Sequence, residues 1–351
     1  MKIVGYAASV LLLGGIGSMS SAAEDEAFQR IVPVAFENIA KFGQSLDVKN
    51  GLAVIGGHDR AVVFQRDFPL PDQWGQVVAF SPKDSAQAKG FGAAVTWVDQ
   101  ALAVAAPKED TGRVYRYGKD PAGNWRLLEV IQPPESQASQ RFGTALASHE
   151  GWLAVGAPFA EVKEEKNAGR VYLYHCPAGQ PCGLAAQISD PTPEADARFG
   201  LSLAMTGQWL AVGSVAKDVV QFKGALIPKS GVDTQNFAIA KGDAPFCGED
   251  VGAVFIYSLA ALREGSTVPA DSLAPPDAEC LQQFGAALAL EGDLLAVGSP
   301  TKDVGDKLFS GVVYVYRALG RDGGRRCYWH RTKPPRMAPL AAVWCGGTAN
   351  C

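Results

Sequence analysis

The stretch FGTALASHEGWLAVGAP, residues 142–158, decides the fold because its pattern occurs five times in the chain. In four copies the phenylalanine precedes the leucine of the Leu-Ala-Val run by eleven residues, and in the first copy by ten. Constant spacing of this kind indicates an internal structural repeat. The other copies are FGQSLDVKNGLAVIGG from Phe42, FGAAVTWVDQALAVAAP from Phe91, FGLSLAMTGQWLAVGS from Phe199 and FGAALALEGDLLAVGSP from Phe284.

Two further segments complete each repeat. The first is an alternating run of Val, Tyr and Phe opened by a small residue, which is typical of a strand. Its copies are GRVYRY from Gly112, GRVYLY from Gly169, GAVFIY from Gly252, GVVYVY from Gly311 and a degraded AVVF from Ala61. The second is an apolar segment that ends near proline, as in NWRLLEVIQPP from Asn124 and WGQVVAFSP from Trp74. One repeat therefore contains four strands.

Four short antiparallel strands in a repeat of roughly fifty residues are the composition of a β-propeller blade. The continuous apolar LAVG runs agree with this, because a strand near the propeller axis has no face exposed to water. We therefore predict an all-β propeller of four-stranded antiparallel blades. Five Phe-Gly copies favour five blades, and six or seven blades or an incomplete ring are the alternatives.

The order FG, LAVGAP and GxVYxY resembles the FG-GAP repeat of integrin alpha-subunit propellers in its short bacterial form, and the resemblance covers residues 42–316. It implies the same propeller fold, in which relatives usually close at seven blades. Because the phenylalanine recurs once per blade, we predict that it is a core residue. These repeat-core residues are Phe42, Phe91, Phe142, Phe199 and Phe284.

The chain opens with Lys2, an apolar stretch and then Ser21-Ala22-Ala23 before an acidic run. This pattern predicts a secretory signal over residues 1–23. A membrane anchor is the weaker alternative, because glycines and serines interrupt the apolar stretch before it reaches the ~20 residues of a span. The expected location is secreted, periplasmic or at the cell surface, with no membrane span in the mature chain.

The propeller is expected over residues 24–318 and a basic, cysteine-containing tail over 319–351. FQRIVPVAFENIA from Phe28 resembles the fourth-strand segments but has no blade of its own, so we predict that it closes the ring against the last blade. The tail segment CYWHRTKPP is either a divergent outer strand or part of an irregular terminus. The longest repeat interval, from Phe199 to Phe284, contains an insertion at residues 219–250.

Seven cysteines in a secreted chain permit disulfides. Cys176 and Cys182 bracket a predicted hairpin, and Cys247 and Cys280 flank the third strand of the long repeat, so both pairs are candidate disulfides. The net charge of −4 and the pI near 5.7 argue against a nucleic-acid partner.

No catalytic, cofactor or metal site is predicted. The four histidines have no motif around them, and GxSxG and HExxH are absent from the sequence. Integrin-type blades often carry a DxDxDG calcium loop, but the corresponding loops here, DVKN, WVDQ, SHEG, MTGQ and LEGD, offer at most two acidic side chains each. The calcium site implied by the family resemblance is therefore not expected.

Acidic residues gather in the connections between the second and third strands, which a ring places on one face. They are candidates for binding cations or a basic partner, whereas charges in solvated loops are the ordinary explanation, because lysines are interspersed. The candidates are Glu109, Asp110, Glu161, Glu164, Glu165, Asp218, Asp303 and Asp306.

These observations predict a secreted, non-enzymatic propeller that binds an extracellular or envelope protein or glycan through loops on one face. The inference from fold to function is an analogy. One alternative is a carbohydrate-active enzyme with paired carboxylates near the central channel. Another is a structural component of the cell envelope.

Overall fold

The computed structural model describes residues 31, 41–57, 59–82, 89–135, 137, 139–222, 225–228, 250–319 and 328–331. These residues form strands apart from one short helix, α1 (Leu259–Arg263). The strands make five four-stranded antiparallel sheets and one two-stranded hairpin, all within one compact unit of the chain, Pro33–Cys351. The predicted fold class is confirmed: an all-β propeller with about five blades.

Each blade follows the repeat, and its strands pair in chain order. The first blade contains β1 (Ser45–Lys49), β2 (Leu52–Gly57), β3 (Arg60–Arg66) and β4 (Trp74–Phe80), and the second contains β5 (Val95–Val98), β6 (Ala101–Ala106), β7 (Arg113–Lys119) and β8 (Trp125–Ile131). The third contains β9 (Ala145–His149), β10 (Trp152–Ala157), β11 (Arg170–His175) and β12 (Gly183–Ser189). The fourth contains β13 (Phe199–Met205), β14 (Trp209–Ser214), β17 (Ala253–Ser258) and β18 (Asp271–Leu273), and the fifth contains β19 (Ala287–Glu291), β20 (Leu294–Ser299), β21 (Val312–Leu319) and β22 (Tyr328–Arg331).

The LAVG strands of the second, third and fourth blades, β6, β10 and β14, are apolar because each buries both faces. In β10, Leu153 and Val155 belong to the core between the second and third blades. Ala154, which points the other way, belongs to the core between the third and fourth blades. A polar residue at any of these positions would be removed from water without a partner. The absence of alternation in this strand is thus a consequence of its place between two other blades.

The phenylalanine of each Phe-Gly pair packs on aromatic side chains of the third strand. The ring centroid of Phe142 lies 5.3 Å from that of Tyr172 and 6.3 Å from that of Tyr174, both in edge-on geometry that favours aromatic pairs. This explains why the third strand reads GxVYxY. The phenylalanines that are fully buried are Phe91, Phe142, Phe199 and Phe284.

Phe42 differs from the other four because no blade precedes it within the described residues. Its side chain is only half-buried, and its ring lies 6.3 Å from that of Phe64 in β3. Burial of the Phe-Gly phenylalanine therefore requires the preceding blade as well as its own.

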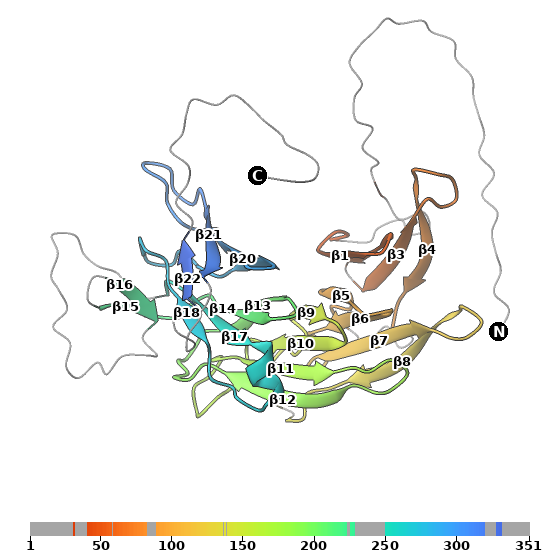
Figure 1. Cartoon of the computed structure of the whole chain (residues 1–351), viewed down its shortest axis with the longest axis horizontal. Coiled ribbons are helices and arrows are strands. Elements are labelled where there is room, and N and C mark those ends of the chain that lie inside the picture. The colour runs from red at the N-terminus through yellow and green to blue at the C-terminus, as the bar shows by residue number, and fades with distance from the viewer. Residues whose placement is uncertain are drawn as a thin grey trace, which may run out of the picture. The chain divides into compact units, whose positions relative to one another are not determined.

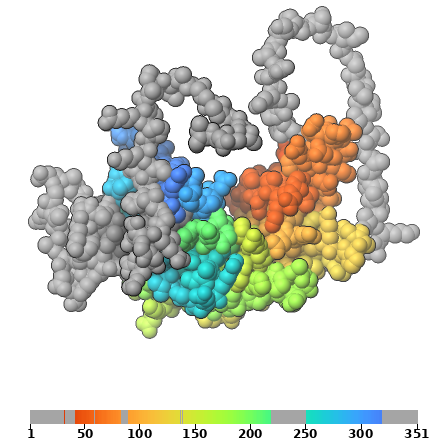
Figure 2. Space-filling view, in the orientation of Figure 1, coloured from red at the N-terminus to blue at the C-terminus, as the bar shows by residue number. Residues whose placement is uncertain are grey.

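The innermost strands β1, β5, β9, β13 and β19 follow one another, so that the blades are arranged in chain order (Figures 1 and 2). Hydroxyl groups link neighbouring inner strands: Ser45 Oγ donates to the Gly92 carbonyl at 2.9 Å, and Ser148 Oγ donates to that of Trp97 at 2.6 Å. Ser202 stands at the same repeat position as Ser45, and its Oγ donates to the Gly285 carbonyl.

The fourth strand of the fifth blade comes from the tail. β22 pairs with β21 in antiparallel register, Tyr316 opposite Arg331 and Leu319 opposite Tyr328. The segment CYWHRTKPP thus contains an outer strand, the first of the two alternatives left open above. The signal at residues 1–23 and the predicted closing strand over 28–40, except Ile31, lie outside the described residues.

The insertion leaves the fourth blade intact. It begins with the hairpin β15 (Val219–Phe222) and β16 (Ala225–Pro228), and the chain rejoins the sheet at β17, which pairs with β14. Residues 229–249 of the insertion lie outside the described residues.

Candidate functional site

The connections between second and third strands and the linkers between blades all lie at one end of the blades. Neighbouring strands are antiparallel, so the connection from second to third strand lies at the same end as the linker to the next blade. We call this end the loop face. Its described connections are residues 59, 107–112, 158–169, 215–218, 250–252 and 300–311, together with the hairpin of β15 and β16. Its described linkers are 81–82, 89–94, 132–135, 137, 139–144, 190–198 and 274–286. The eight acidic candidates all belong to these connections.

A buried lysine ties the linker before the fourth blade to a connection of that blade. The side chain of Lys217 is fully buried, and its ammonium lies 3.0 Å from Asp190 Oδ2 and 3.1 Å from Glu194 Oε1. It also donates to the Thr192 carbonyl at 2.7 Å. Burial raises the pKa of Asp190 and that of Glu194, and the Lys217 ammonium opposes this effect. The carboxylates of Asp190 and Glu194 therefore both pair with the ammonium of Lys217, and their role is structural.

Lys302 occupies the equivalent position in the fifth blade. Its ammonium lies 2.6 Å from Glu279 Oε1 and donates to the Asp277 carbonyl at 2.6 Å. Lys302 is one of the lysines interspersed among the acidic candidates, and it is buried. The signal that could have found both lysines is the repeated Lys-Asp three residues after the LAVGS runs, in GSVAKD and GSPTKD, each preceded in the chain by an acidic linker.

Three acidic candidates have structural partners. Glu109 is buried, accepts a 2.7 Å hydrogen bond from the Tyr115 hydroxyl and pairs with Arg113 at 3.0 Å. Burial, together with the bond to Glu109, raises the pKa of Tyr115 to about 12. Asp218 accepts from the Asp250 N–H at 3.2 Å, and Asp303 from the Phe309 N–H at 2.8 Å. Glu109 is therefore not a solvated loop charge, because it is buried and holds its own connection together.

The other five acidic candidates are exposed on the loop face. They are Asp110, Glu161, Glu164, Glu165 and Asp306. Three belong to the single connection between β10 and β11, so the exposed charge is concentrated on the third blade. Within the described part of the chain, no three His, Cys, Asp or Glu side chains gather in a way that could hold a metal ion.

A pocket opens in the same connection. Phe159 is half-buried, and two guanidinium groups lie over its ring: that of Arg141 is 4.3 Å from the ring centroid and that of Arg198 is 5.8 Å from it. The Gln137 side chain fixes the rim, because it accepts from the Glu161 N–H at 2.8 Å and donates to the Glu161 carbonyl at 3.1 Å. The pocket has a volume of about 390 Å³ and is lined by Gln137, Phe159, Glu161, Lys166 and Asn167.

The chemistry of this pocket suits a charged or amphipathic side chain. The Phe159 ring offers apolar contact, Lys166 and Asn167 offer donors, and Glu161 offers an acceptor. The guanidinium groups of Arg141 and Arg198 pack over the ring. Arginines pack on aromatic faces while keeping donors for other groups. Sequence reasoning identified Glu161 but missed Phe159, Arg141 and Arg198. The two arginines each precede a Phe-Gly pair, which is the only sequence signal that places them near the loop face.

A second pocket of about 510 Å³ lies at the opposite end, where the hairpins between first and second strands and between third and fourth strands are found. It is lined by Asn50, Gly51, Leu52, Gln65, Arg66, Asp67 and Lys119. No aromatic side chain lines it, so the pocket at Phe159 has the better anchor for a partner.

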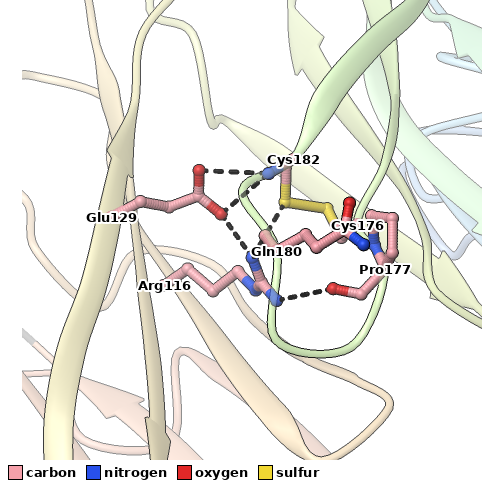
Figure 3. A network of polar contacts seen from close by, with 6 residues as sticks. All are labelled: Arg116, Glu129, Cys176, Pro177, Gln180 and Cys182. Carbon is pink, nitrogen blue, oxygen red and sulfur yellow. Dashed lines mark hydrogen bonds and ion pairs between the residues drawn. A yellow bond between two sulfur atoms is a disulfide. The ribbon is translucent and has the colours of Figure 1, made fainter.

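The predicted disulfide Cys176–Cys182 is present and closes the hairpin between β11 and β12. Figure 3 shows how this hairpin is attached to the second blade. Arg116 in β7 binds Glu129 in β8 and donates to the Gln180 carbonyl at 2.9 Å. Glu129 also accepts from the Cys182 N–H at 3.0 Å. The network is a structural clip between two blades.

The second candidate disulfide is only partly within the described residues. Cys280 is disulfide-bonded. Cys247, the partner expected for it, lies outside the described residues. No helix in the described part of the chain has the length and apolar character needed to cross a membrane.

Comparison with known proteins supports the repeat. Residues 270–316, which contain β18, β19, β20 and part of β21, match the family model described as FG-GAP repeat, so the resemblance to this repeat is confirmed. No curated protein was found to match the chain.

Among solved structures, the chain is similar to Hsv2 of Kluyveromyces marxianus, with a TM-score of 0.45 and 10% identity over 86% of this chain and 75% of that one. It is similar to Hsv2p of Kluyveromyces lactis with a TM-score of 0.44 and 8% identity, over 84% and 73% of the two chains. The fold assignment rests on the strand pairing described above.

Proposed function

We propose that this chain is a secreted, non-enzymatic propeller that binds an extracellular or envelope protein through its loop face, with Phe159 as the central contact. The observation that carries the proposal is the pocket at Phe159. Aromatic and arginine side chains dominate the energy of protein interfaces, and here two arginines flank one half-buried ring. Glu161 lines the pocket, and the exposed carboxylates Glu164 and Glu165 belong to the same connection and would provide a charged rim.

The secreted location is supported by the signal-like N-terminus and by the disulfide Cys176–Cys182, because structural disulfides persist mainly in oxidising compartments. The alternative is a glycan partner. Glycans are often bound by stacking a sugar ring on an exposed aromatic face, and the face of Phe159 is already covered by Arg141. A protein partner therefore fits the geometry better.

The enzymatic alternative requires two carboxylates with separate roles in an accessible site. The described carboxylates with raised pKa values are Asp190 and Glu194, and both bind the buried ammonium of Lys217. This structural use supports the binding function over the hydrolytic one.

The test is affinity capture from the extracellular and envelope fractions of cells that express the protein. Wild type is compared with Phe159→Ala and with the control Phe68→Ala, which removes an exposed phenylalanine from the hairpin end. We expect Phe159→Ala to lose at least one partner that wild type and Phe68→Ala retain, with an affinity loss of about 30-fold for a 2 kcal/mol contact. Identical capture by all three proteins would refute the proposal.

A further inference from the structure

Each blade holds the next through one recurring joint. At the joint between the third and fourth blades, a methyl group on Gly156 would overlap the Gly200 carbonyl, and one on Gly169 would overlap the backbone of Phe199. A methyl group on Gly200 would lie 2.7 Å from Val171 Cγ2. We call the Phe-Gly pair of a blade its hook. We call the group that receives the next blade's hook the socket; it consists of the small residue of the second strand and the Gly and Val at the start of the third strand. At Gly156 and Gly169 a side chain would collide with the backbone of the next blade, so this close approach of two backbones requires glycine there.

The same joint recurs on either side. The sockets of the second and fourth blades consist of Ala105, Gly112 and Val114, and of Gly213, Gly252 and Val254. They receive the hooks Phe142-Gly143 and Phe284-Gly285. The socket valines Val114, Val171 and Val254 are all 0% exposed, so a filled socket leaves this side chain no contact with water.

Among the described residues, no hook fills the socket of the fifth blade. Its members are Gly298, Gly311 and Val313. The nearest atoms to a methyl group at Gly298 belong to Ala287, and those at Gly311 to Pro300, both within the fifth blade itself. Val313 is 65% exposed, in contrast to the buried valines of the three filled sockets.

The hook of the first blade fills no socket in the part of the chain that the structure describes. Gly43 has a φ of 89°, within the 85–91° range of the other four hook glycines, yet no atom lies within 4 Å of a methyl group placed on it. On the same strand face, Leu46 and Val48 are 66% and 57% exposed. The equivalent residues of the second blade, Val95 and Trp97, are 6% and 3% exposed because they pack on the first blade.

We propose that two copies of this chain join head to tail, the first blade of one copy docking against the fifth blade of another. The two exposed faces are the two halves of a contact that the chain already makes between its own blades, so each copy offers what the other lacks. The interface is heterologous, and it therefore propagates into closed rings or open filaments. Phe159 lies in the third blade, so the proposed binding pocket takes no part in this joint.

The experiment measures the mass of the purified chain by sedimentation over a range of concentrations. Leu46→Asp blocks the hook face and Val313→Asp blocks the socket, while Val268→Asp introduces the same charge at a valine that is 72% exposed outside both faces. An unpaired carboxylate in the joint should weaken association by about 100-fold or more. Circular dichroism of each variant establishes that it is folded.

We expect wild type and Val268→Asp to form dimers and larger species, and each of the other two variants to remain monomeric. Mixing Leu46→Asp with Val313→Asp should restore one intact joint and yield a one-to-one dimer that does not grow further. A wild type that stays monomeric at about 100 μM would overturn the proposal and indicate that a segment of the same chain covers both faces. Association that survives Val313→Asp, or a mixture that fails to dimerise, would overturn it equally.

Discussion

Replacing Lys217 by methionine tests the role assigned to the buried cation. Methionine has a similar length and keeps the apolar contacts of the stem, so the change removes mainly the ammonium and its contacts with Asp190 and Glu194. The carboxylate of Asp190 is 1% exposed and would be left buried without its cation. Breaking a buried pair in this way costs about 3–5 kcal/mol of unfolding free energy.

Lys302→Met is the matched control. Lys302 stands at the same repeat position, but its partner side chains Asp277 and Glu279 are 55% and 46% exposed and remain hydrated when the ammonium is lost. The expected cost is about 1 kcal/mol, the range of solvent-exposed ion pairs. The assay is guanidinium unfolding followed by circular dichroism, with the difference between the two variants as the result of interest.

The pH dependence gives a second readout. Burial already raises the folded-state pKa of Asp190, and loss of the opposing Lys217 ammonium raises it further. The folded variant therefore takes up a proton at a higher pH than the unfolded chain, and its stability increases as the pH falls from 7 toward 5. Equal losses in the two lysine variants, or a Lys217→Met cost that is the same at pH 7 and pH 5, would refute the structural assignment.

Three other predictions follow from the repeat. Phe142→Ala should cost about 3–5 kcal/mol of unfolding free energy, whereas Phe42→Ala should cost less, because its ring is only half-buried; equal costs in denaturant titrations would contradict the role given to the preceding blade. Replacing both Cys176 and Cys182 by serine should lower stability by about 2 kcal/mol, because the bridge closes a short loop, and a variant as stable as wild type would show that Arg116 holds the hairpin alone. Millimolar calcium should leave the melting temperature unchanged, and a rise that a chelator reverses would show that distant loops supply the missing ligands.

The extent to which the sequence predicts this molecule depends on the range of each interaction. The Phe-Gly to Leu-Ala-Val spacing and the Val-Tyr alternation are local patterns, and they were sufficient to predict five four-stranded blades. The Cys176–Cys182 bridge was also accessible, because its cysteines bracket one hairpin. Local patterns work here because each blade repeats the same chemistry.

Interactions between blades were much harder to predict. The pair of Arg116 with Glu129 and the attachment of the hairpin at Gln180 depend on two neighbouring sheets. In the sequence Lys217 resembles any other loop lysine, because its partners belong to the linker 190–198, which only the fold brings next to it. The flanking of Phe159 by two arginines requires three segments that are distant in sequence, and the sequence alone gives each of them an ordinary appearance.

The central claim is that the loop face around Phe159 binds the partner. Hydrogen exchange of the chain alone and in complex with the captured partner tests it most directly, because exchange reports protection along the whole backbone. The account predicts that protection appears in residues 158–169 and in the linker around Arg141, and that the hairpin from Cys176 to Cys182 exchanges as before. Protection confined to that hairpin, with unchanged exchange around Phe159, would contradict the account.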